Sequence, residues 1–197
     1  MKAESRNGIR AIAAKDQNAW RAWLSKNHET ETSVWLIIHH KESGTPSVSY
    51  PEAVDEALCF GWIDSKPNKR DDSSYYQFFS RRNPKSNWSK VNKEKVERLL
   101  KENKMAKAGL YMVTLAKENG TWDALNDVDN LIIPQDLKTE LGKHTAALVN
   151  FEQFPPSVRR GILEWIFNAK RRETREKRIR ETASLAAQNI RANQYSK

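Results

Sequence analysis

Residues 50–88 contain the densest run of aromatic side chains in the chain, and they constrain the fold more than any other segment. The segment opens with an amphipathic stretch that starts at Tyr50 and stops before Gly61, which predicts a helix ending at that glycine. Pro51 suits the first turn of this helix, because the N–H that proline lacks would have no partner there. A helix followed directly by aromatic strands predicts a mixed fold.

Two predicted strands follow the helix, at residues 62–69 and 74–81, joined by a turn rich in Pro, Asn and Asp. Alternation in the second strand places Tyr76 and Phe78 on one face and Phe79 on the other. Because aromatic side chains occur on both faces, we expect both faces of the sheet to be at least partly covered.

The remaining segments complete the expected architecture. Residues 33–40 are short, β-branched and aromatic, which predicts a buried strand. Residues 1–15 have little apolar content and predict a frayed start. Asp16 can cap a following helix, and from Ser89 onward the pattern is almost entirely helical. We therefore predict an α+β fold: a small antiparallel sheet of about three strands flanked by helices, with a helical C-terminal half.

The pattern predicts two regions along the chain. Residues 1–105 would form an α+β domain, and residues 106–197 would form a helical region packed on it. The last helix is expected near residues 173–193. Its predicted apolar stripe consists of Ile179, Ala183, Ala186 and Ile190.

Composition favours a folded protein of the cytoplasm. The 197 residues are 38% hydrophobic and include seven tryptophans, which bury a large area per residue. One cysteine cannot form an internal disulfide, in agreement with a reducing compartment. The N-terminus lacks an apolar signal core, and no segment approaches the roughly 18 apolar residues of a membrane helix. We expect no membrane association.

The net charge of +9 is concentrated in the last quarter of the chain. A basic helix can attract nucleic acid or an acidic partner. Acidic residues interrupt this basic run, however, and the pattern favours a solvated helix face of alternating charge. Any nucleic-acid binding is therefore expected to be weak and non-specific.

A cluster of arginine and aromatic residues is the candidate site for a small anionic or planar ligand. Guanidinium groups bind carboxylate or phosphate through paired donors, and aromatic rings supply stacking surface. The same residues could instead form an aromatic core rimmed by arginines. The candidate ligand-binding residues are Trp62, Asp64, Tyr76, Arg81, Arg82 and Trp88.

Asp64 and Cys59 raise the alternative of an enzyme. A carboxylate within an aromatic strand is costly unless it is paired, and Arg81 on the neighbouring strand is a natural partner. Asp64 could be an acid, a base or a ligand-orienting group, or half of an internal ion pair with Arg81. Cys59 could be a nucleophile, but its place on the apolar face of the helix favours a small core residue.

No motif predicts a cofactor or a metal. Gly61 stands alone, so no glycine-rich phosphate loop is present. His39 and His40 are adjacent in a predicted strand and point to opposite faces, which prevents them from easily sharing one metal. A nucleophile–base–acid triad cannot be identified.

Several short motifs along the chain carry a family resemblance. They are Glu56-Ala57-Leu58-Cys59-Phe60-Gly61-Trp62-Ile63-Asp64, Arg81-Arg82, Pro84-Lys85-Ser86-Asn87-Trp88-Ser89, Pro155-Pro156-Ser157-Val158-Arg159-Arg160 and Ala169-Lys170-Arg171. Together they resemble the YdeI/OmpD-associated (bacteriocin-protection) family, over roughly residues 16–190. The segment before the paired arginines departs from the family pattern, with Phe79-Ser80 in place of Thr-Pro, and Met105-Ala106-Lys107-Ala108-Gly109 replaces Met-Thr-Pro-Ala-Gly.

The resemblance implies a soluble bacterial protein in a context of stress or resistance to antimicrobial peptides. No reaction is established for the family. Combined with the residues themselves, it leads us to expect a cytoplasmic protein that binds a small anionic or planar ligand. The alternatives are an enzyme using Asp64 or Cys59, and a nucleic-acid or partner-binding module using the basic C-terminal helix.

Overall fold

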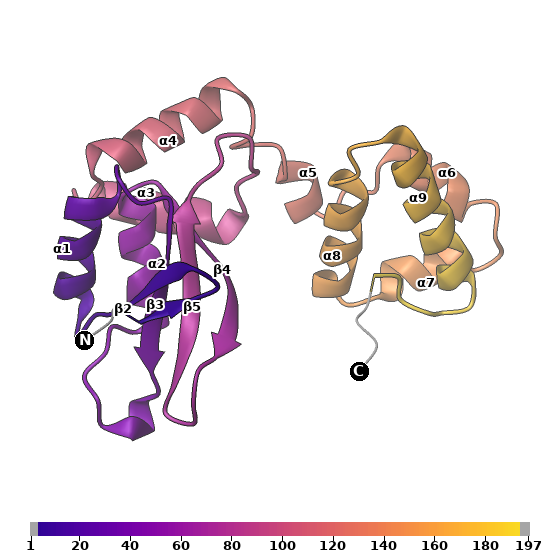
Figure 1. Cartoon of the computed structure of the whole chain (residues 1–197). Helices are drawn as coiled ribbons and strands as arrows, with labels where there is room; N and C mark the ends of the chain where they lie inside the picture. Colours follow the sequence, from indigo (N-terminus) through magenta and orange to yellow (C-terminus); the bar gives the residue numbers. More distant parts are fainter. Residues whose placement is uncertain (1–3, 194–197) are drawn as a thin grey trace. The chain divides into compact units, whose positions relative to one another are not determined.

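The computed structural model describes residues 4–193 and contains two compact units, which divide between Asp123 and Ala124 (Figure 1). This division lies further along the chain than residues 105 and 106, where the sequence pattern placed it. Helix α4 (Lys107–Glu118) lies in the first unit and contributes to its core. The backbone N–H of Ala106, just before α4, donates to the carbonyl of Cys59 at 3.0 Å.

The first unit contains a five-stranded sheet. Its strands, in chain order, are β1 (Ser5–Arg6), β2 (Ile9–Ala13), β3 (Ser33–His39), β4 (Trp62–Lys69) and β5 (Ser74–Arg81). Their order across the sheet is β1-β2-β3-β5-β4. The three predicted strands are therefore present, with β5 between β3 and β4.

The three predicted strands pair antiparallel, as expected, but the expectation of about three strands is wrong in number. β1 and β2 add two strands within the segment expected to be frayed, and β2 pairs with β3 in parallel. The sequence did not predict these strands for two reasons. β1 is too short to show an alternation of apolar and polar residues, and Arg10 interrupts the apolar residues of β2. A parallel pair also depends on the crossover through helix α1 (Gln17–Asn27), a long-range contact that no local pattern encodes.

The helices of the first unit begin where the sequence pattern predicted caps. The Asp16 carboxylate accepts a hydrogen bond from the Ala19 N–H at 2.7 Å, at the start of α1. The Ser89 hydroxyl accepts from the Asn92 N–H at 3.4 Å. Ser89 precedes helix α3 (Lys90–Lys101), and the other helices of this unit besides α4 are the short η1 (Lys41–Ser43) and α2 (Tyr50–Cys59).

One face of the sheet packs on the helices and the other carries a smaller cluster. Phe79 is fully buried in the main core with residues of α1 and α2. Tyr76 and Phe78 project to the opposite face, where they pack with Trp35. The predicted alternation along β5 is thus confirmed, and it places the end of this strand beside the helical core.

The second unit is helical, as predicted. Its core is built from all of the helices of the unit, including α8 (Pro156–Phe167) and α9 (Arg172–Ala187), with Phe151 from α7. Ile190 was expected on the buried stripe of the last helix, but it follows the end of α9 and is 48% exposed. The shorter helices are α5 (Asn126–Asp129), α6 (Gln135–Leu141) and α7 (Ala147–Gln153).

Within residues 4–193, none of the helices combines the length and the apolar character that a membrane span requires.

Candidate functional site

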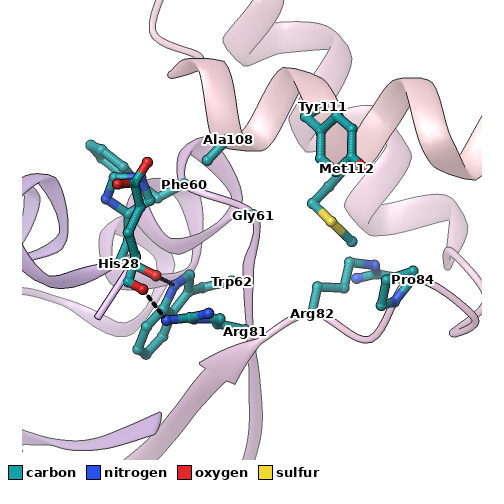
Figure 2. Close-up of a pocket in the computed structure, with 11 residues that line it drawn as sticks. His28, Phe60, Gly61, Trp62, Arg81, Arg82, Pro84, Ala108, Tyr111 and Met112 are labelled. Atoms are coloured by element: carbon teal, nitrogen blue, oxygen red, sulfur yellow. Dashed lines mark hydrogen bonds and ion pairs between the residues drawn. The ribbon is translucent and has the colours of Figure 1, made fainter. Parts of the chain in front are cut away.

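A cleft of about 540 Å³ opens in the first unit where α2 passes into β4 and β5 ends (Figure 2). Its walls come from four places: the end of α1, the turn after α2, the end of β5 and the first turns of α4. The lining residues are His28, Glu29, Phe60, Gly61, Trp62, Arg81, Arg82, Pro84, Ala108, Tyr111 and Met112.

Two glycines bring α4 close enough to form one wall. Gly61 has φ +72°, and a Cβ there would lie 2.8 Å from Met112 Cγ. A Cβ on Gly109 would lie 2.3 Å from the carbonyl oxygen of Cys59, so a side chain at this position would force the helices apart. The close approach places Tyr111 and Met112 over the cleft, and Met112 projects toward Arg82 (Figure 2).

Trp62 and His28 form a fixed wall on the other side. The indole N–H of Trp62 donates to the His28 carbonyl at 3.4 Å, and its ring meets Trp23 edge to face at 6.0 Å. His28 Nδ1 lies 2.9 Å from the Leu24 carbonyl, and its ring packs against Phe60. These contacts hold both rings in one orientation.

Arg81 and Arg82 leave the end of β5 in different directions (Figure 2). The Arg81 guanidinium reaches the loop after α1, where Nε donates to the Glu31 carbonyl at 2.8 Å and Nη2 donates to the Glu29 carbonyl. Its charge is therefore directed at backbone carbonyls, and the side chain fastens this loop to the end of the sheet.

Arg82 is a buried guanidinium with no acidic partner among the residues that the structure describes. It is 5% exposed, its central carbon lies 3.7 Å from the centroid of the Trp88 ring, and Nη2 donates to the Asn87 carbonyl at 2.6 Å. Nε is buried without a hydrogen-bond partner. Burial away from water lowers the pKa of Arg82 to about 10.

The structure brings together half of the predicted site. Trp62, Arg81 and Arg82 line the cleft, and Trp88 supports Arg82 from behind without lining it. Tyr76 lies on the opposite face of the sheet, where its hydroxyl donates to the Glu4 carboxylate at 2.6 Å.

Comparisons with known families place this cleft within a recognised domain. Residues 12–112, just over half of the chain, match the family model described as a domain of unknown function (DUF8412). The chain belongs to this family. Every residue that lines the cleft lies within the matched range, so the cleft is a feature of the DUF8412 domain.

Residues 130–189, in the second unit, match the model described as Bacteriocin-protection, YdeI or OmpD-Associated (OmdA). This match confirms the family resemblance seen in the sequence. The motifs around Gly61 and Arg81 lie in the DUF8412 domain, and those after Pro155 lie in the OmdA domain. Neither the curated proteins nor the solved structures contain a match to this chain.

The ion pair between Asp64 and Arg81, one of the alternatives that the sequence left open, is not formed. In the sheet Asp64 lies opposite Phe79, whereas Arg81 lies opposite Trp62. The Asp64 carboxylate instead accepts a hydrogen bond from the Tyr50 hydroxyl at 2.7 Å. Asp64 thus pairs with the Tyr50 hydroxyl, and Arg81 pairs with backbone carbonyls in the loop after α1.

Cys59 is fully buried in the main core, as predicted. Burial raises the pKa of its thiol to about 11, and the nearby Glu56 carboxylate acts in the same direction. The thiol does not line the cleft. Among residues 4–193, no group of three or more His, Cys, Asp or Glu side chains is placed to hold a metal ion.

Sequence reasoning missed several lining residues, including His28, Tyr111 and Met112. They are far from Gly61 and Arg82 in the sequence and show no motif of their own. One signal was available: Gly109 interrupts an otherwise good helical pattern, and such a glycine often marks a close approach of another backbone.

Proposed function

We propose that the cleft of the DUF8412 domain binds a small anionic ligand and that Arg82 is its anchor. The observation that supports this function is the buried Arg82 guanidinium, which has a ring and a carbonyl as neighbours but no acid among residues 4–193. Burying a charge without a counter-charge is unfavourable, and such groups are usually paired. A ligand anion would supply the missing partner.

The remaining atoms of Arg82 fit this role. Nη2 is occupied by the Asn87 carbonyl, and Nε is enclosed, whereas Nη1 makes no hydrogen bond with the described part of the chain and is not enclosed. Because Arg82 lines the cleft, Nη1 is the donor available to an incoming anion. Stacking on Trp88 fixes the plane of the guanidinium before the ligand arrives, which lowers the entropy lost on binding.

The rest of the cleft suits a small molecule with a planar or apolar part. Its volume of about 540 Å³ is in the range of ordinary ligand pockets. Phe60, Trp62 and Met112 supply apolar surface, and Tyr111 adds a ring that is 64% exposed. An exposed aromatic at the rim of a cleft is well placed to cover a bound ligand.

We also propose a physiological setting, a bacterial cytoplasm under stress or under attack by antimicrobial peptides. Support comes from the OmdA match, whose family description refers to bacteriocin protection. A single buried cysteine with a protonated thiol agrees with a reducing compartment.

Titration of the ¹⁵N-labelled protein with acetate, benzoate and inorganic phosphate tests the proposed site. We expect at least one of these anions to shift the Gly61 amide and the Trp62 indole signals, with saturation. Arg82→Gln should abolish the shifts, and Arg10→Gln, at an exposed arginine outside the cleft, should leave them unchanged.

The proposal is wrong if none of the anions shifts these signals in the wild-type protein at neutral pH. It is also wrong if Arg82→Gln, shown to be folded by its amide spectrum, binds as well as the wild type.

A further inference from the structure

We infer that the ligand is a singly charged carboxylate carried on a planar or apolar body, and this inference rests on the proposed anion site. The carboxylate would meet Arg82, and the body would lie against Met112 and Tyr111. Charge, hydrogen-bond donors and wall chemistry each support this class over phosphates and other multiply charged anions.

The charges that line the cleft sum to a single positive charge. Arg81 and Arg82 are cationic, Glu29 is anionic, and histidine is counted as neutral. A monoanion brings the sum to zero. A phosphate dianion would leave an uncompensated negative charge against Phe60 and Met112, which is unfavourable where water is excluded.

Most of the hydrogen-bond donors beside the two arginines are already occupied, which favours a carboxylate over a phosphate. Phosphate sites commonly use several free backbone N–H groups. Here the N–H of Gly61 donates to Leu58, that of Arg82 donates to Gly61, and that of Arg81 donates to Thr32. The Trp62 indole donates to His28. These donors are occupied, whereas Arg82 Nη1 is open to the cleft, and a single guanidinium nitrogen can satisfy a carboxylate more completely than a phosphate.

The walls provide surface for the rest of the molecule. Met112 carries a flexible and polarisable side chain that adapts to varied shapes. Tyr111 is the most exposed aromatic side chain among the described residues that line the cleft. Its neighbour Leu110 is also exposed on α4 but does not line the cleft, which makes it a matched control.

The test compares four probes by calorimetry: 2-naphthoate, acetate, inorganic phosphate and the neutral 2-naphthamide. We expect naphthoate to bind most tightly. Naphthamide should bind about 10-fold or more weaker, since it loses a charge-assisted hydrogen bond. Tyr111→Ala should weaken naphthoate binding by several-fold and leave acetate binding unchanged, whereas Leu110→Ala should affect neither.

The outcomes separate the inference from the function on which it rests. Arg82-dependent binding of phosphate in preference to naphthoate would overturn the carboxylate assignment and leave the anion site intact. Equal binding of naphthoate and naphthamide would also overturn it. If no probe binds in a manner that depends on Arg82, both the inference and the proposed function fail.

Discussion

The guanidinium carbon of Arg82 lies 3.7 Å from the centroid of the Trp88 ring, and both side chains are buried. Stacking on an aromatic face is attractive for a cation, but it replaces only part of the hydration that burial removes. The Arg82 guanidinium is therefore held in place before a ligand binds, and the hydration that it lost on burial is only partly replaced.

This relationship predicts that Arg82 contributes more to binding than to stability. Arg82→Met keeps the packing on Trp88 and removes a buried charge that has no acid nearby. We expect the free energy of unfolding in urea to stay within about 1.5 kcal/mol of wild type, or to rise, because replacing buried charge by apolar volume is often neutral or stabilising. Trp88→Ala should instead cost about 3–5 kcal/mol, as for other buried tryptophans. A large loss of stability in Arg82→Met would show that the residue is a structural element.

Asp64→Ala should have a small effect on stability, because the carboxylate is only partly buried and has one neutral partner, Tyr50. We expect a cost of about 0.5–1.5 kcal/mol, the usual value for one hydrogen bond. Burial and this hydrogen bond raise the pKa of Tyr50 to about 12. In the Asp64→Ala variant, absorbance titration should show that the pKa of Tyr50 has moved partway back toward 10.0. An unchanged Tyr50 titration would contradict this account.

The Cys59 thiol should react slowly in the native protein. Labelling with a thiol reagent at pH 8 is expected to be far slower than that of free cysteine, and urea should restore rapid labelling of one thiol per chain. The folded protein retains the thiol proton up to about pH 11, whereas the unfolded chain loses it near 9.0. Cys59 thus contributes stability below pH 9.0 that is lost as the pH rises toward 11. Labelling at the rate of free cysteine would refute the prediction.

Gly109→Ala should destabilise the first unit strongly, although alanine is the better helix former. The added Cβ would lie 2.3 Å from the Cys59 carbonyl oxygen, so α4 must move. We expect a loss of about 1–3 kcal/mol, typical of overpacking, and weaker anion binding because α4 carries one wall of the cleft. Gly161→Ala in α8 is the control, since a Cβ there meets no atom within 4 Å. It should be neutral or slightly stabilising.

Binding of nucleic acid by the C-terminal helix should remain weak and non-specific. Several arginines of α9 are engaged within the second unit: Arg172 pairs with Glu176 and Arg175 with Asp136, each at 2.7 Å. Fluorescence anisotropy with a short duplex should give a Kd in the range of about 10⁻⁴–10⁻⁶ M at physiological salt. Asp136→Asn frees Arg175 and should tighten binding slightly. Sequence-selective binding below this range would contradict the prediction.

The sequence by itself determined the elements around the site. Period-two alternation over residues 74–81 separated Phe79 from Tyr76, and the caps at Asp16 and Ser89 marked helix starts. These features depend on near neighbours in the chain, which is why local patterns predict them. The arginine pair and Trp62 were identified from the local cluster of arginine and aromatic residues, and the structure places Trp62 opposite Arg81 in the sheet.

Tertiary structure alone decided which side chains meet. The parallel pairing of β2 with β3, the contact of Asp64 with Tyr50 and the wall formed by Tyr111 all join segments brought together only by packing. A side chain takes the partner that is nearest in space, and local periodicity contains no information about that distance. For the same reason, the sequence identified Arg82 as a candidate, but only the fold showed that its guanidinium is buried beside Trp88 without an acid.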